Sequence, residues 1–107
     1  MTDKVIHDFE NIAEVFKQLG DPTRLHIFWI LCHREVCVSQ LAFLLKMSSP
    51  AISHHLRPLR HSGLIVSRRE GKEVYYSMSD CNESRLLHTM IEQLSQITCP
   101  NGGTYEK

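Results

Sequence analysis

The sequence has 107 residues, and its 12 Lys and Arg balance its 12 Asp and Glu, so the formal net charge is zero. Hydrophobic residues make up 42% and charged residues 22%, which indicates one folded domain and excludes a disordered chain. No run of 18 uncharged apolar residues is present, which excludes a membrane-spanning helix, and residues 1–10 lack the apolar stretch of a secretory signal. A cytoplasmic protein with no membrane partner is therefore expected.

The first predicted helix covers residues 5–19, where apolar side chains recur every three or four positions. Asp21 followed by Pro22 is typical of a helix start, with the aspartate as N-cap and the proline in the first turn. The helix that they begin runs over about 22–33 and is apolar on nearly all sides. We therefore expect it to be the central buried helix.

Two short helices are predicted next, on either side of a tight polar turn. Ser39 is the expected N-cap of the first, and Ser49 with Pro50 at the first helical position begins the second, which ends near His61. This pair is typical of a helix-turn-helix. Pro58 removes a backbone hydrogen bond inside the second helix, so a bend is expected there. The core-facing stripe of the second helix is Ile52, Leu56 and Leu59.

The periodicity then changes to that of strands. Residues 64–69 and 73–78 are rich in β-branched and aromatic side chains, and Gly71 between them can take the positive φ that a tight hairpin needs. A hairpin directly after a helix-turn-helix is a wing. A last helix is expected to begin at Asp80 as N-cap and to run to about residue 98. The expected domain is 1–99, followed by a flexible tail at 100–107.

The charge is unevenly distributed along the chain. Residues 48–79 carry five Lys or Arg against two Asp or Glu, a local balance of +3, and three histidines. A basic segment of this kind can follow DNA phosphates although the whole chain is neutral. Side chains of the second short helix would contact bases, and those of its end and of the hairpin would contact phosphates or the minor groove. The candidate DNA-binding residues are Ser48, Ser49, Ser53, His54, His55, Arg57, Arg60, Arg68, Arg69 and Lys72.

Four segments together resemble the ArsR/SmtB family of winged-helix repressors: 16–25 (FKQLGDPTRL), 35–41 (EVCVSQL), 53–57 (SHHLR) and 69–76 (REGKEVYY). The resemblance covers about residues 9–98. It implies a mainly α fold with a small β-hairpin, comprising about five helices and a two-stranded wing. It also implies a symmetric homodimer built from the first and last helices, which represses transcription by occupying operator DNA and leaves it when an inducer binds.

The same resemblance implies where a metal would act, and this sequence departs from it. Of the four positions of the last-helix zinc site, Asp80, Asn82, Gln93 and Gln96, only the aspartate is a good ligand, so that site is expected to be non-functional. The paired thiolates of the family are reduced here to Cys37-Val38-Ser39. No cofactor is therefore certain.

Sulfur chemistry is the hypothesis that remains for the inducer. A soft metal(loid) or a thiol oxidant could act on Cys37 together with Cys32 or Cys99, although buried cysteines that only fill the core are an equally simple interpretation. His26, His33 and His88 are expected at the surface or its boundary rather than as ligands.

Two alternatives to an inducible repressor stay open. The basic face could bind an acidic protein partner, or the protein could be a repressor of this family without metal or thiol sensing. An enzyme is not expected, because the sequence contains no phosphate-binding loop, metal motif or nucleophile–base pair.

Overall fold

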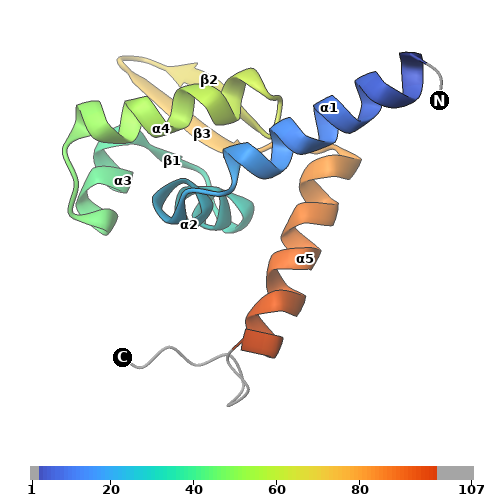
Figure 1. Ribbon diagram of the computed structural model, residues 1–107. Helices are drawn as coiled ribbons and strands as arrows, with labels where there is room; N and C mark the ends of the chain where they lie inside the picture. The colour runs from blue at the N-terminus through green and yellow to red at the C-terminus, as the bar shows by residue number, and fades with distance from the viewer. Residues whose placement is uncertain (1–2, 99–107) are drawn as a thin grey trace.

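The computed structural model describes residues 3–98, with side chains placed from residue 8 to residue 97. Figure 1 shows α1 and α5 projecting from a body formed by the remaining helices and a small sheet. The elements are α1 (Asp3–Gln18), α2 (Pro22–His33), β1 (Val36–Cys37), α3 (Val38–Leu45), α4 (Ser49–His61), β2 (Ile65–Glu70), β3 (Glu73–Met78) and α5 (Asn82–Thr98). Within the described residues, no helix has the length and apolarity needed to cross a membrane.

Helix α2 is the centre of the core, as the sequence predicts. Asp21 caps it by accepting a hydrogen bond from the backbone N–H of Arg24 at 2.9 Å. Ile27 and Phe28 are fully buried, and the predicted stripe of α4 packs into the same cluster. The other buried residues of this cluster come from every element except α1 and β3, and from the residue before β2: Leu31, Val36, Leu41, Ile52, Leu56, Leu59, Leu64, Ile65 and Leu87.

The two short helices begin earlier than the sequence predicts. The N-cap of α3 is Cys37 rather than Ser39, and Gln40 Oε1 accepts the N–H of Cys37 at 2.9 Å. The N-cap of α4 is Ser48 rather than Ser49, and its Oγ accepts the N–H of Ala51 at 3.2 Å. Pro50 is tolerated one position further into the helix than expected, because the first N–H groups of a helix have no partner within it.

Helix α4 continues through Pro58 to His61 as one element (Figure 1). Pro58 lacks the N–H that an interior helical position donates. The helix nevertheless continues past it, and the next residue, Leu59, is fully buried in the core. Ser62 and Gly63 end the helix, and Gly63 has φ +83°.

The sheet has three strands rather than the two predicted, in the order β1-β3-β2. The predicted hairpin is confirmed, and Gly71 at its turn has φ +63°. The strand that the sequence did not reveal is β1, in which Val36 pairs with Tyr76 and Cys37 with Tyr75. Two residues are too few to show an alternating pattern, so only the pairing with β3 identifies this strand.

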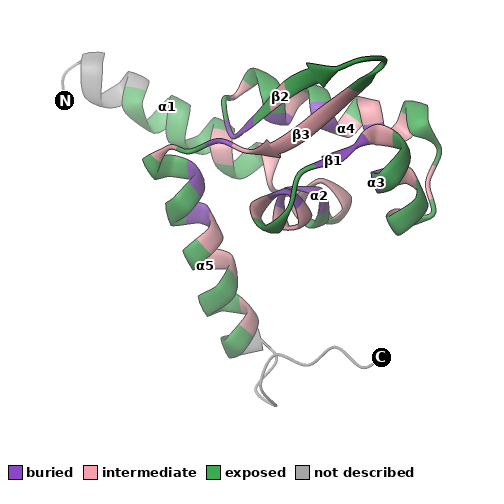
Figure 2. Ribbon diagram, turned by 180° about the vertical axis from the view of Figure 1, so that it is seen from behind, coloured by how far each residue is buried: buried purple, intermediate pink, exposed green. Residues whose placement is uncertain are grey.

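Helix α5 starts at Asn82, two residues after the predicted cap. Asp80 instead binds the side chain of Arg85, and the carbonyl of Cys81 accepts the first helical hydrogen bond at 3.1 Å. The fully buried Ser84 ties this helix to the body by donating to the carbonyl of Leu64 at 2.9 Å. Beyond this turn α5 leaves the body, and its exposed residues are apparent in Figure 2.

The position of the α4 cap can be tested by substitution. Ser48→Ala should lower the free energy of unfolding by about 1 kcal/mol, because the side-chain acceptor for Ala51 is lost. Ser49→Ala should change it by less than about 0.5 kcal/mol, because Ser49 has no capping role. Urea denaturation at one fixed protein concentration measures both values. A larger loss of unfolding free energy for Ser49→Ala than for Ser48→Ala would show that Ser49 is the cap.

Candidate nucleic-acid interface

The outer face of α4 is exposed and basic. Ser49, His54, Arg57 and Arg60 are exposed on it, while the opposite side of the helix is buried. Neither arginine has an acidic partner among the residues whose side chains are described. Because no carboxylate among the described side chains engages these guanidinium groups, they are available to an anionic ligand.

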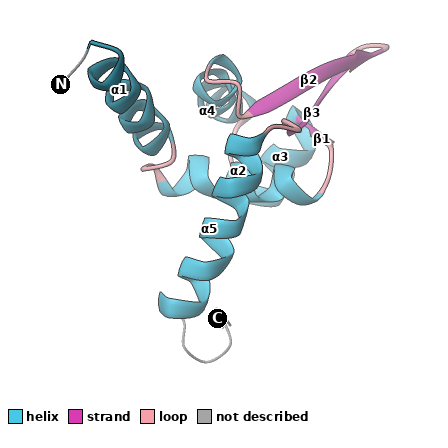
Figure 3. Cartoon of the chain, turned by 90° about the vertical axis from the view of Figure 1, so that its right-hand side faces the viewer, coloured by secondary structure: helices cyan, strands magenta, loops and turns pink. Residues whose placement is uncertain are grey.

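An open hollow joins this face to the base of the wing. It is lined by residues of α4 and by one residue of β3: Ser53, Leu56, Arg57, Arg60, His61 and Tyr76. The partly buried Ser53 lies here, one helical turn before Arg57. Helix α4 and the hairpin therefore contribute to one continuous surface, with the hairpin extending beyond the helix as a projecting arm (Figure 3).

His55 differs from the expectation that it faces outward. Its side chain is only 16% exposed, and its Nδ1 lies 3.7 Å from Oδ2 of Asp21, the cap of α2. The pKa of Asp21 is lowered, mainly by the N–H of Arg24 and further by His55. The structure thus places His55 between α4 and the start of α2, whereas His54 beside it is exposed.

The three basic residues of the wing are in different situations. Arg69 and Lys72 are exposed near the hairpin turn, and Arg69 donates to the carbonyl of Gly71 at 3.4 Å. Arg68 forms a two-point ion pair with Glu35, with N···O distances of 2.7 and 2.8 Å, and a further one with Glu70 at 2.6 Å. Its guanidinium also lies 5.1 Å from the centre of the Tyr75 ring.

The pair between Arg68 and Glu35 fastens the wing to the segment before β1. The hydrogen bonds from Arg68 lower the pKa of Glu35 below its ordinary value, so the pair stays charged at neutral pH. Arg68 was predicted to contact DNA, but in this conformation two carboxylates hold it. No local pattern could identify Glu35 as the partner of Arg68, because 33 residues separate the two.

A further basic residue was missed by the sequence reasoning. Lys46 lies in the turn between α3 and α4, is exposed, and takes a left-handed conformation with φ +56°. In the sequence, Lys46 is a single lysine beside the predicted turn, and it lies just before the basic segment 48–79.

The described cysteines are all free and lie in different environments. Cys32 is partly buried, and this burial raises the pKa of its thiol to about 12. Cys37 is buried in β1, with Sγ 3.2 Å from Oγ of Ser39, while the thiol of Cys81 donates to Ser84. Cys99 lies outside the described residues.

The four positions that correspond to the last-helix zinc site are occupied as follows. Asp80 and Asn82 both accept hydrogen bonds from Arg85, and Gln93 and Gln96 are exposed. Among the described residues, no group of three or more His, Cys, Asp or Glu side chains is gathered for a metal ion.

Two short helices joined by a three-residue turn, with the second helix exposed beside a β-hairpin, define a winged helix-turn-helix regulator. A family described as bacterial regulatory protein, arsR family, matches residues 21–67. The chain is also 40% identical over 86 residues to the arsenic resistance transcriptional regulator ArsR2 of Pseudomonas putida, covering 79% of this chain and 70% of that protein. The chain therefore belongs to the arsR family of bacterial transcriptional regulators, and not to a family of enzymes.

Two further similarities agree with this assignment. The chain is 39% identical over 87 residues to a transcriptional repressor SmtB homolog of Synechocystis, covering 81% of this chain and 66%, just under two thirds, of that protein. A solution structure of Mb0332 from Mycobacterium bovis, described as a homodimeric winged helix-turn-helix DNA-binding domain, superimposes with a TM-score of 0.82 at 24% identity. That alignment covers 99% of this chain and 97% of the other, and it shows the shared fold.

Proposed function

We propose that this protein is a transcriptional repressor that binds one operator sequence in double-stranded DNA as a homodimer. The observation that carries the proposal is the basic face of α4, where Arg57 and Arg60 are exposed beside the wing and have no acidic partner in residues 8–97. A helix with this surface can enter the major groove, where arginine recognises guanine. The free N–H groups at its start, next to Ser48 and Ser49, suit a phosphate.

The proposed DNA contacts fall into two groups. Ser53, His54 and Arg57 lie on α4 and would contact bases. The second group would contact phosphates and so position the helix: Arg60, Arg69, Lys72 and, from the turn, Lys46.

Two of the residues predicted from the sequence would have other roles. Arg68 would contact a phosphate only if it released Glu35 and Glu70. His55 would orient α4 against α2 rather than touch DNA.

The homodimer is proposed from the outer faces of α1 and α5. Both carry apolar side chains, spaced by three, four or eight residues, that the chain leaves exposed: Phe9, Ile12 and Phe16 on α1, and Leu86, Leu94 and Ile97 on α5. An apolar groove between the two helices and α2 adjoins them. A second copy would bury these faces, and its two-fold axis would place the α4 helices about 34 Å apart, one turn of DNA.

The inducer is proposed to be a soft metal(loid) or a thiol oxidant acting on Cys37 with Cys32 or Cys99. The support is chemical: Cys37 keeps one cysteine of the pair that the family uses, and soft ions prefer sulfur. The high pKa of Cys32 works against it, because the reactive form is the thiolate.

DNA recognition can be tested with a duplex selected from a random library and with random duplexes. The protein should prefer the selected site by about 10³-fold or more. Arg57→Ala should remove about 1–3 kcal/mol of binding to that site and relax the preference. Arg69→Ala and Lys72→Ala should weaken all duplexes alike and reduce the salt slope by about one.

Arg34→Ala is the matched control for charge, since Arg34 is exposed at the end of α2 and lines a hollow with residues of α2 and α3 rather than of α4 or the wing. It should leave the preference and the salt slope unchanged. Equal binding to every duplex would contradict the proposed repressor and would favour the alternative, in which the basic face binds an acidic protein partner. Identical effects of all three test variants would mean that α4 does not read bases.

The dimer can be tested by sedimentation. Phe16→Glu should raise the dimer dissociation constant by about 100-fold or more, because burying an unpaired carboxylate costs several kcal/mol. Phe43→Glu is the control, since Phe43 is 83% exposed on α3, outside the proposed interface. Dimerisation of Phe16→Glu with wild-type affinity would contradict the assignment of α1 to the interface.

Thiol sensing can be tested by release from the selected duplex with arsenite, cadmium and peroxide. Cys37→Ser should abolish the response, and Cys81→Ser, the control, should keep it. Because the pKa of Cys32 is about 12, its alkylation at pH 8 should be slower than that of an exposed thiol. If the variant with all four cysteines replaced by serine were still released from the duplex like the wild type, thiol sensing would be excluded. The protein would then be a repressor of this family without thiol sensing.

A further inference from the structure

An aromatic and imidazole cluster joins the end of α2 to the second turn of α5. His33 lies in the last turn of α2 and His88 on α5, 55 residues apart in the chain. Their Nε2 atoms are 3.2 Å apart. Trp29 stacks on the ring of His88 with centroids 5.0 Å apart and meets the ring of His33 edge-on at 4.4 Å.

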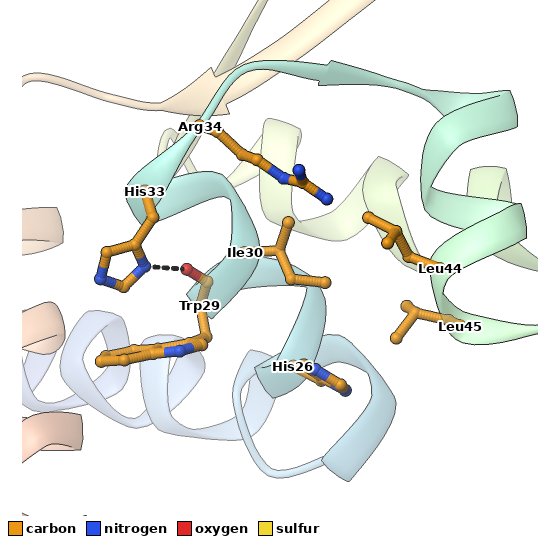
Figure 4. Close-up of a pocket in the computed structure, with 7 residues that line it drawn as sticks. All are labelled: His26, Trp29, Ile30, His33, Arg34, Leu44 and Leu45. Atoms are coloured by element: carbon orange, nitrogen blue, oxygen red, sulfur yellow. Dashed lines mark hydrogen bonds between the residues drawn. The ribbon is translucent and has the colours of Figure 1, made fainter.

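Both imidazoles are held in place rather than free to rotate. Nδ1 of His33 donates to the carbonyl of Trp29 at 2.8 Å (Figure 4). This hydrogen bond assigns the ring proton of neutral His33 to Nδ1 and leaves a lone pair on Nε2. A ligating histidine in a metal site is usually oriented in this way, by donating its other N–H to a carbonyl or carboxylate. Stacking on Trp29 fixes the plane of His88.

The separation of the two nitrogens fits a shared metal ion. With metal–nitrogen bonds of about 2.0–2.1 Å, two nitrogens 3.2 Å apart subtend an angle of about 103° at the metal, close to tetrahedral. His33 is exposed and His88 is partly exposed, so a hydrated ion can reach them. Water would fill the remaining coordination positions, as in other open sites.

We propose that His33 and His88 form a binding site for a borderline divalent transition-metal cation such as Zn²⁺ or Ni²⁺. Imidazole is a preferred ligand of these ions. In the absence of metal, one Nε2 carries the proton shared between the two rings, and His88 supplies it because His33 donates through Nδ1. Metal binding moves that proton of His88 to its Nδ1, so both rings coordinate through Nε2 in neutral form.

The site has a structural consequence, because its ligands come from two elements with different roles. Helix α2 is the core of the helix-turn-helix body, whereas α5 leaves that body soon after its buried first turn. A metal held by both helices would fix the angle between them. The binding site itself is independent of the proposed function, and only an effect of that angle on DNA would depend on it.

Trp29 is the one tryptophan of the chain, so its fluorescence reports this site directly. Titration of the full-length, metal-free protein with Ni²⁺ should give saturable quenching at one equivalent per chain, and Zn²⁺ should compete. Zn²⁺ should also raise the Tm, because an ion that binds only the folded state stabilises it. His33→Ala and His88→Ala should each weaken Ni²⁺ binding at least about 10-fold and abolish the Tm increase.

Two further variants separate coordination from packing. His88→Gln keeps a polar side chain beside His33 but is a poor ligand, so it should fold normally and still lose the metal response. His26→Ala removes another exposed histidine of α2, which lines the same hollow as Trp29 and His33, and should bind Ni²⁺ like the wild type. Wild-type Ni²⁺ affinity in His33→Ala and His88→Gln, or no saturable quenching of the wild type, would reduce the pair to a hydrogen bond between two imidazoles.

Discussion

The burial of α2 is the constraint on which the other elements depend. Ile27, Phe28 and Leu31 are at most 2% exposed, and side chains from both short helices, the sheet and α5 complete the cluster around them. Each fully buried side chain of this size contributes about 1.5–3 kcal/mol through burial alone. Because Ile52, Leu56 and Leu59 bury one side of α4 in this cluster, the opposite face of the helix points to solvent. The exposure of the basic face is thus a result of how the core is packed.

Most of the architecture could be predicted from the sequence, because it follows from periodicity and turn chemistry. The i, i+4, i+7 stripe of α4 and the glycine at the hairpin turn are local signals, and both were confirmed. The helix starts were predicted less well, because Ser48 and Ser49 are equally good caps in isolation. Strand β1 had no signal, since its two residues are defined only by their partners on β3.

The candidate interface was predictable as a set of residue types but not as an arrangement. The sequence identified a basic segment, and ten residues in it were equally plausible contacts. Tertiary contacts then divide them: Arg57 and Arg60 have no acidic partner among the described side chains, Arg68 has two, and His55 faces the cap of α2. The carboxylates of Glu35 and Asp21 engage Arg68 and His55, respectively, and each lies far from its partner in the sequence. The usable positive charge of the surface is therefore smaller than the charge count of the segment suggests.

Cys37 takes part in three structural features at once. It is half of strand β1, it faces Tyr75 on the wing, and it is the N-cap from which α3 begins. The helix-turn-helix and the wing therefore share a residue, which couples the position of one to that of the other. A signal that changes the spacing of two such bodies in a dimer would therefore move each recognition helix together with its wing, and their relative position would be kept.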